Sequence, residues 1–426
     1  MSSYKIGTKC VQSGYTPKNG EARILPIYQS TTFKYESSEE MGKLFDLEAE
    51  GYFYTRLQNP TNDAVAAKIC DLEGGVAAML TSSGQAASFF SMVNIASAGD
   101  HIIASAAIYG GTFNLLDVTM RKMGYDITFI SPDATEEEII AASKPNTKCV
   151  FAETLSNPAL VVLDIETFAN AAHKIGVPLI VDNTFPTPIN CRPFEFGADI
   201  VTHSTTKYMD GHASTVGGCI VDSGNFDWTK YADKFPGLCT PDASYHGITY
   251  TERFGKGAYI TKATAQMMRD LGSIQAPMNA FLLNFGLETL ALRMKQHCAN
   301  AQKVAEYLEK HPKVTWVSYP GLPSNKYYAL AQKYLPSGSS GVVSFGVAGG
   351  REAATRVMDN MQLAAIVTHV ADSRTCLLHP ASTTHRQLTD EQLEACGVSP
   401  ELIRLSVGIE DVEDIIADLE QSLAKL

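Results

Sequence analysis

Short apolar runs alternate with polar or amphipathic segments along the first half of the chain. Seven runs have the length of a strand: VAAML, HIIAS, DITFI, KCVFAE, VPLIVD, ADIVTH and GCIV. Because they are apolar on both faces and separated by helical segments or turns, they predict a parallel sheet buried between helical layers. Residues 61–72, just before them, predict a helix that ends at Gly74-Gly75. Functional groups of such a sheet gather at the carboxyl ends of its strands.

The pattern changes in the second half of the chain. Residues 223–257 are rich in Gly, Pro, Tyr and Thr, and residues 277–311 predict one long helix. The runs VTWVSY, GVVSFGV and IRLSVG then predict three more strands, and residues 411–423 predict a terminal helix. We therefore expect three parts, namely an N-terminal arm over residues 1–60, a larger α/β domain over 61–265 and a smaller α/β domain over 266–426.

Charge and cysteine usage narrow the class of protein. The 426 residues carry 34 Lys and Arg against 46 Asp and Glu, a formal charge of −12, which disfavours a nucleic-acid or anionic-membrane surface. The uncharged stretch 74–99 contains too many Ser, Thr, Asn and Gln residues for a membrane-spanning helix. Nine scattered cysteines without a C-x-x-C pair predict reduced thiols. With no signal peptide recognisable in residues 1–20, we expect a soluble, cytoplasmic protein.

Three of the predicted strands end in polar groups that a core would not select. In MLTSSGQAAS a strand turns into a helix near Gln85, and free N–H groups at a helix start can bind phosphate. Asp182 ends the run VPLIVD, where an unpaired carboxylate would be costly. Lys207 follows Ser204 and Thr206 in HSTTKYMDGH, about one strand–helix–strand unit beyond Asp182.

Each group also has an ordinary structural explanation. The serines before Gln85 can simply cap a helix, Asp182 can be satisfied by backbone or by Thr184, and Lys207 can extend to solvent. Together, however, a phosphate site, a strand-end Asp and a shielded Lys match what proteins supply to pyridoxal 5'-phosphate. The G-x-G-x-x-G, G-x-x-x-x-G-K, H-E-x-x-H and G-x-S-x-G motifs are absent, which disfavours dinucleotide, nucleotide, zinc and serine-hydrolase chemistry. A Schiff-base aldolase without cofactor stays as an alternative.

The motifs resemble those of the cysteine/methionine-metabolism family of pyridoxal phosphate enzymes over nearly the whole chain. Seven stretches besides the lysine segment occur in that family's order: YFYTRLQNPTND, SSGQAA, YGGT, ETLSNP, VDNTF, HPASTTH and RLSVGIED. The resemblance implies a fold type I pyridoxal phosphate transferase with a mostly parallel seven-stranded sheet and a smaller C-terminal α/β domain. It also implies a homo-oligomer, usually a tetramer built as a dimer of dimers.

The resemblance further implies a role for each matched residue. Lys207 would form the Schiff base and act as the mobile base, and Asp182 would hold the ring nitrogen. Tyr109 would stack on the ring and act as an acid, which makes it a third catalytic residue beside Lys207 and Asp182. The phosphate would be bound by Gly84, Gln85, Ser204 and Thr206, and the neighbouring subunit's phosphate by Tyr54 and Arg56. Asn157 would lie near the ring hydroxyl. On the substrate side, Arg404 would bind the carboxylate, and Thr375 and Tyr54 would also contact the substrate. His379 and His385 are expected to be structural.

One segment points to a branch of this family. FPGLCTPDASYHGITYTERFGKGAYI resembles enzymes that act on O-acetylhomoserine, and Gly111 stands where methionine γ-lyases commonly carry cysteine. The resemblance therefore implies γ-replacement on O-acetyl-L-homoserine by sulfide or a thiol, giving L-homocysteine or methionine and acetate. The alternatives are a methionine γ-lyase or a cystathionine γ-synthase or γ-lyase activity. A non-catalytic binding protein on the same fold is an alternative of a different class.

Overall fold

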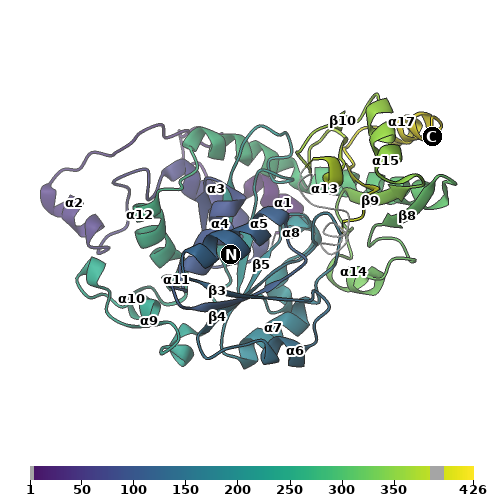
Figure 1. Ribbon diagram of the computed structural model, residues 1–426. Coiled ribbons are helices and arrows are strands. Elements are labelled where there is room, and N and C mark those ends of the chain that lie inside the picture. The colour runs from purple at the N-terminus through teal and green to yellow at the C-terminus, as the bar shows by residue number, and fades with distance from the viewer. Residues whose placement is uncertain (1–3, 384–397) are drawn as a thin grey trace.

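The computed structural model describes residues 4–383 and 398–426 and has a larger and a smaller α/β part (Figure 1). The larger part contains a seven-stranded sheet in which every strand runs parallel except β7, which is antiparallel to both neighbours. In spatial order the strands are β1 (Ala77–Thr81), β7 (Gly218–Asp222), β6 (Ile200–His203), β5 (Leu179–Asp182), β4 (Thr147–Glu153), β2 (His101–Ser105) and β3 (Asp126–Ile130). Each of the seven predicted runs coincides with one of these strands to within one or two residues at either end.

Helices cover both faces of this sheet (Figure 1). The helices of the first 190 residues are α1 (Ile6–Gln12), α2 (Ser38–Phe45), α3 (Pro60–Glu73), α4 (Gly84–Val93), α5 (Gly110–Asn114), the π-helical turn η1 (Leu115–Met120), α6 (Glu136–Ala141), α7 (Ile165–Lys174) and α8 (Thr187–Asn190). Helix α3 begins at Pro60, where the Asn59 side chain accepts a 2.9 Å hydrogen bond from the Thr61 N–H. It ends at Gly74, whose φ of 82° suits glycine. The predicted helix over 61–72 is therefore confirmed.

The segment after β7 folds into short helices packed beside the sheet. They are η3 (Trp228–Tyr231), α9 (Pro236–Cys239), η4 (Ala243–Tyr245), α10 (Tyr250–Phe254), η5 (Gly255–Gly257), α11 (Ala258–Lys262), η6 (Ala263–Met268) and α12 (Arg269–Leu271). Their aromatic side chains join the main core, where Trp228 stacks on Tyr259 with ring centroids 5.5 Å apart. The turn-rich composition predicted the break in the pattern, and these aromatics explain why the segment stays packed on the body. One further short helix, η2 (Pro193–Phe196), lies between α8 and β6.

The smaller part is a five-stranded sheet with helices on it. The strands, in spatial order, are β10 (Ala365–Ile366), β11 (Cys376–Leu378), β12 (Leu402–Ser406), β9 (Val342–Val347) and β8 (Val314–Ser318). The helices are α13 (Pro277–Lys310), α14 (Tyr328–Tyr334), α15 (Gly350–Asn360), η7 (Pro380–Ser382) and α17 (Val412–Leu423). The predicted strands and long helices are confirmed, whereas β10 and β11 were missed because two or three residues carry no readable period.

Helix α13 belongs to both parts. Its first half places Leu283 and Leu287 in the core shared with α1 and α3, and its second half places Val304 and Leu308 in the core of the smaller sheet. The predicted domain limits at residues 60 and 265 stay a prediction. Across the described ranges, no helix combines the length and apolar character needed to cross a membrane.

Polar side chains in the middle of α13 also bind both parts. The guanidinium of Arg293 donates to the carbonyl of Tyr208 at 2.7 Å, directly after Lys207. One helical turn later, the ring Nδ1–H of His297 donates to the carbonyl of Val407 at 2.8 Å, just beyond the end of β12. A single helix thus holds the segments that follow β6 and β12.

Candidate active site

Three neighbouring parallel strands of the larger sheet end in polar residues. β4 ends at Glu153, β5 at Asp182 and β6 at His203. The strand register places Glu153 directly beside Asp182 and Asp182 beside Thr202. Lys207 lies in the turn that follows β6. The carboxyl ends of β5 and β6 therefore bring Asp182 and the lysine turn to one edge of the sheet, as the sequence spacing indicated.

Residues next to Asp182 in the fold hold its carboxylate at this edge. Its Oδ1 accepts a 2.9 Å hydrogen bond from the Thr184 N–H, so the predicted structural partner is present. Burial raises the pKa of the Asp182 carboxyl, while the hydrogen bonds from Thr184 and the nearby His203 act to lower it. A cationic partner at the open side of this carboxylate would favour its charged form.

The Lys207 amine has the environment of a reactive group rather than of a surface lysine. Burial, and then the positive charge of Arg404, lower its pKa to about 8. Its Nζ makes no hydrogen bond to any residue that the structure describes. With a pKa of about 8, roughly a tenth of the amine is neutral at pH 7.

The start of helix α4 forms a site for an anion, here called the α4 seat and made of Gly84, Gln85 and Ser204. The Ser83 side chain caps the helix by accepting from the Ala86 N–H at 3.1 Å, which leaves the N–H groups of Gly84 and Gln85 for a ligand. Ser204 packs so closely that a Cβ on Gly84 would lie 2.6 Å from the Ser204 Cβ. Only glycine permits this approach.

Thr206 lies beside the α4 seat with its hydroxyl already engaged. Its Oγ1 donates to the Gly217 carbonyl at 3.2 Å and accepts from the Gly217 N–H at 3.1 Å. The predicted contact of Thr206 with a phosphate would have to replace or share these bonds.

Tyr109 precedes α5 and is half exposed. Its ring and the Gln85 amide approach each other over Gly111, where an added Cβ would lie 2.5 Å from Tyr109 Cε1 and 2.6 Å from Gln85 Nε2. The Tyr109 N–H donates to Glu153 Oε1 at 2.7 Å. The aromatic ring is thereby placed next to both the α4 seat and the strand ends.

Arg404 is a buried cation in β12 that has no counter-ion among the residues the structure describes. Its Nη2 donates to the carbonyls of Thr368 and His369 at 3.2 and 3.1 Å, and its Nη1 donates to Asn157 Oδ1 at 3.4 Å. No described carboxylate pairs with it, and its buried Nε–H has no partner among the described residues. Burial lowers the pKa of Arg404. An unpaired buried guanidinium is costly, so the site favours an incoming anion.

The hydroxyl of Thr375 is already hydrogen-bonded within the protein. It donates to Glu410 Oε2 at 2.9 Å and accepts from the Gly408 N–H at 2.9 Å. His379 binds the Ser382 hydroxyl at 2.9 Å and the Pro400 carbonyl at 2.7 Å, which agrees with a structural role. His385 lies outside the described residues.

Tyr54 and Arg56 are not joined to the α4 seat of their own chain by any hydrogen bond between described residues. Arg56 donates to the Arg269 carbonyl and lies over the Tyr54 ring, with 5.2 Å between its Cζ and the ring centroid. Both side chains are exposed. They follow α2 in the N-terminal arm, and α2 itself extends away from the body (Figure 1).

Two residues at the site were not predicted from the sequence. Glu153 ends the run KCVFAE as Asp182 ends VPLIVD, so the same signal, a carboxylate closing a buried strand, was present. His369 gave no such signal. Its Nε2 is buried without a described partner, and burial, followed by the charge of Lys207, lowers its pKa.

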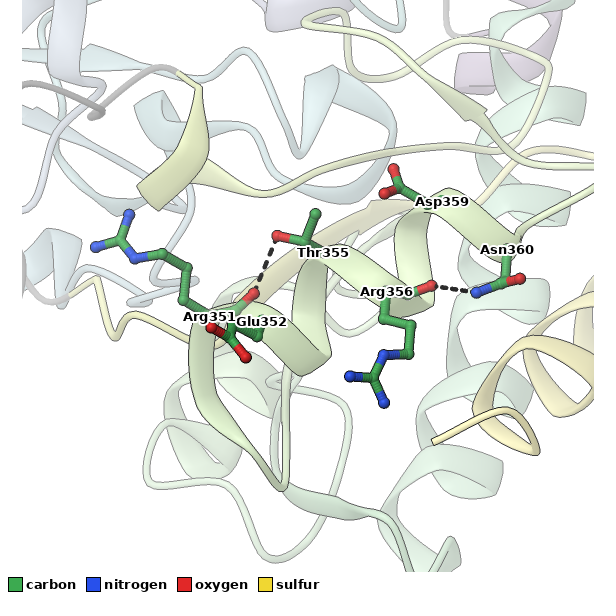
Figure 2. Close-up of a pocket in the computed structure, with 6 residues that line it drawn as sticks. All are labelled: Arg351, Glu352, Thr355, Arg356, Asp359 and Asn360. Carbon is green, nitrogen blue, oxygen red and sulfur yellow. Dashed lines mark hydrogen bonds between the residues drawn. The ribbon is translucent and has the colours of Figure 1, made fainter.

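Two cavities of the molecule lie elsewhere. Figure 2 shows a pocket of about 500 Å³ along α15, where Thr355 and Asn360 bond back to their own helix at 3.0 and 2.7 Å. A cavity of about 1320 Å³ lies between the arm and the body, with Tyr52 and Asp63 among its lining residues. None of the predicted site residues lines either of them.

The residues at the sheet edge fit pyridoxal 5'-phosphate. The α4 seat would hold its phosphate, the Lys207 amine its aldehyde carbon, and Asp182 its ring nitrogen, while the orphaned Arg404 would hold an amino acid's carboxylate. Such an arrangement at the carboxyl edge of a mostly parallel sheet is that of a pyridoxal phosphate-dependent enzyme.

Comparison with known proteins gives the particular family. The profile described as "Cys/Met metabolism PLP-dependent enzyme" matches residues 7–424, so the chain belongs to this family. The predicted family, the fold type I class and the pyridoxal phosphate cofactor are confirmed.

Relatives resemble the chain over its full length. It is 43% identical to "O-acetyl-L-homoserine sulfhydrylase" of Leptospira meyeri, covering 100% of this chain and 98% of the relative. It is 46% identical to "Homocysteine synthase" of Schizosaccharomyces pombe, covering 94% of each. A Campylobacter jejuni crystal structure described as an O-acetylhomoserine (thiol)-lyase, with a pyridoxyl-lysine phosphate, matches with a TM-score of 0.95 and 37% identity over 99% of this chain and 100% of that one.

Proposed function

We propose that the protein is an O-acetylhomoserine sulfhydrylase. It replaces the acetoxy group on Cγ of O-acetyl-L-homoserine with sulfide or a thiol and forms L-homocysteine or methionine and acetate. The observation that carries this proposal is the full-length identity of 43% to an O-acetyl-L-homoserine sulfhydrylase, combined with a site that offers an amine, an anion seat and an unpaired buried guanidinium.

The amino acid is bound at its two charged ends. Arg404 would take the α-carboxylate, because the guanidinium fork matches a carboxylate and its buried Nε–H has no partner among the described residues. Nη2 stays bonded to the carbonyls of Thr368 and His369, which fixes the direction of the fork. Asn157 lies within hydrogen-bond reach of the same guanidinium and of the space above the strand ends.

Proton transfer falls to Lys207. Pyridoxal phosphate, when bound, supplies an electron sink for a carbanion at the amino acid's Cα. The neutral Nζ of Lys207 removes the Cα proton and then moves a proton at Cβ, and its lowered pKa provides the neutral amine. The bond from Cγ to the ester oxygen breaks, acetate leaves with the electron pair, and sulfide forms the new bond at Cγ.

Two other side chains keep the ring in place. Asp182 would hold the proton on the ring nitrogen, which maintains the sink through the reaction. Tyr109, placed over the strand ends by its N–H bond to Glu153, would cover one face of the ring. The α4 seat anchors the phosphate and so orients the ring between these groups.

Product analysis tests this function. Purified protein with bound pyridoxal phosphate is given O-acetylhomoserine with and without sulfide, and homocysteine and 2-oxobutyrate are measured. We expect homocysteine only with sulfide, and little 2-oxobutyrate without it. Ready release of 2-oxobutyrate from methionine or cystathionine, unaffected by sulfide, would instead identify a γ-lyase.

We also propose a homotetramer, built as a dimer of dimers, in the cytoplasm. The arm supports this, since it exposes Met41, Phe45 and Tyr54 and extends away from the body (Figure 1). Tyr54 and Arg56 would reach the α4 seat of the neighbouring chain. Refolding a mixture of Lys207→Ala and Arg56→Ala subunits should restore activity in mixed oligomers, because each site then draws on both chains. Failure of complementation would remove this arrangement.

A further inference from the structure

Glu153 is a buried carboxyl that the proposed reaction does not use. It closes strand β4 and is 7% exposed. Its Oε1 accepts the 2.7 Å hydrogen bond from the Tyr109 N–H, just before α5 begins at Gly110. Glu153 thus fixes the backbone from which the Tyr109 ring extends.

Glu153 also stands next to another carboxyl. The parallel register of β4 and β5 pairs Glu153 with Asp182, so the two side chains leave the sheet at neighbouring positions on the same face. Two carboxylates that share one poorly solvated site cannot both ionise without strong repulsion, and a single proton relieves it.

The surroundings of the two carboxyls differ in a way that assigns this proton. Asp182 receives the Thr184 N–H at 2.9 Å and lies near His203 on β6, which itself binds Glu73. From the part of the chain that the structure describes, Glu153 receives one hydrogen bond, that of the Tyr109 N–H. Burial, and then the charge of Asp182, raise the pKa of Glu153 well above its ordinary value.

We infer that Glu153 is a positioning residue. As a protonated carboxyl it fixes Tyr109 through Oε1 and leaves the negative charge of the pair on Asp182, where it faces the cofactor's ring nitrogen. One side chain thereby links the group on the ring's face with the group on the ring's nitrogen. This inference rests on the roles of Asp182 and Tyr109 in the proposed function.

The first test uses protein from which the cofactor has been removed. The unfolding midpoints of wild type, Glu153→Gln and Asp182→Asn are compared between about pH 5 and about pH 9. A carboxyl whose folded-state pKa is raised stabilises the fold below its unfolded pKa, and this stability is lost as pH rises through the folded pKa. The unfolding midpoint of Glu153→Gln, relative to that of wild type, should therefore rise with pH by at least about 2 °C over this range.

The matched comparisons show which carboxyl holds the proton. The unfolding midpoint of Asp182→Asn should rise less with pH, relative to wild type, than that of Glu153→Gln. The reason is that Asp182→Asn still contains the buried carboxyl of Glu153. Glu137→Gln on α6 removes an exposed carboxylate far from the pair and should show no such trend. The assignment of the proton to Glu153 would be overturned if the midpoint difference between Glu153→Gln and wild type did not change with pH. It would also be overturned if the midpoint of Asp182→Asn rose more than that of Glu153→Gln.

The second test reads the position of Tyr109 in the protein with pyridoxal phosphate bound. The visible circular dichroism of the bound cofactor should fall at least about two-fold in Glu153→Ala, which loses the Oε1 acceptor. Glu153→Gln keeps an oxygen in that place and should retain the band. An unchanged band in Glu153→Ala would overturn the positioning role. Neither test depends on the substrate, so a failed sulfide assay would leave this inference standing.

Discussion

Two lysines, the half-buried Lys207 and the buried Lys262, lie near opposite ends of helix α4. Burial lowers the pKa of each to about 8. Lys262 donates to the carbonyl of Asn94, the C-cap of α4, at 2.6 Å, and its nearest charge is Asp242. Lys207 follows the turn that meets the N-terminus of α4, has no described hydrogen-bond partner at Nζ and faces Arg404.

The difference between these two lysines shows what burial alone decides. Burial sets a similar pKa at both sites, but the amine of Lys262 is satisfied at the negative end of a helix. The amine of Lys207 is left without such a partner, next to an anion seat and a second cation. The surroundings, rather than the depth, separate a structural lysine from a reactive one.

The largest expected effect separates the two lysines by turnover. Lys207→Ala should lower the rate of homocysteine formation by about 10⁴-fold, because it removes the base proposed to move protons at Cα and Cβ. Lys262→Ala should stay within about ten-fold of wild type, since Lys262 lies at the far end of α4. Initial rates, with unfolding midpoints measured alongside, check this. A near-normal rate in Lys207→Ala would break the comparison.

A smaller effect is expected on the free energy of unfolding, which should distinguish the Lys262 and Lys207 variants. Lys262→Met should lower the free energy of unfolding by about 1–3 kcal/mol, because the Asn94 carbonyl loses its buried donor. Lys207→Met should lower the free energy of unfolding by less. The amine of Lys207 has no described partner, and removing a poorly solvated charge offsets the lost contacts. Urea unfolding at fixed protein and cofactor concentrations measures both.

The pH dependence of stability is the control for that prediction. Because the folded-state pKa of Lys262 lies near 8 and the ordinary value is 10.5, its contribution is fully present above the higher value and is lost as pH falls towards the lower one. The deficit of Lys262→Met should therefore grow as pH rises from about 8 to about 10. A deficit that shrinks over this range would contradict the burial of an uncharged amine.

The smallest expected effect is a pKa shift. In protein without cofactor, reaction of Lys207 with an amine reagent should show a midpoint near its pKa of about 8. Arg404→Met should raise that midpoint by up to about one unit, because a neighbouring positive charge is removed. The profile of Lys262 should not move, since Asp242 is its charged neighbour. Site-resolved mass spectrometry follows both, and equal shifts would contradict the comparison.

The sequence predicted much of this architecture, and the reasons for its failures are physical. Seven apolar runs gave the larger sheet, and carboxylates or lysines at strand ends pointed to Asp182 and Lys207. The same rule would have found Glu153, which closes β4. The burial of Lys262 could not be predicted, because it depends on how the segment after β7 packs against α4. His369 follows a two-residue strand, too short to carry a pattern.

Helix α13 has a consequence for substrate choice. Arg293 and His297, about one 5.4 Å turn apart, bind the segment after Lys207 and the segment after Arg404. The helix therefore fixes the spacing between the turn that carries Lys207 and the strand that carries Arg404, the residues proposed to act on Cα and to hold the carboxylate. This spacing is common to all α-amino acids, whatever their side chains. If Lys207 and Arg404 act as proposed, one helix fixes the selection of the amino-acid backbone, and the preference for a leaving group can change without altering that helix.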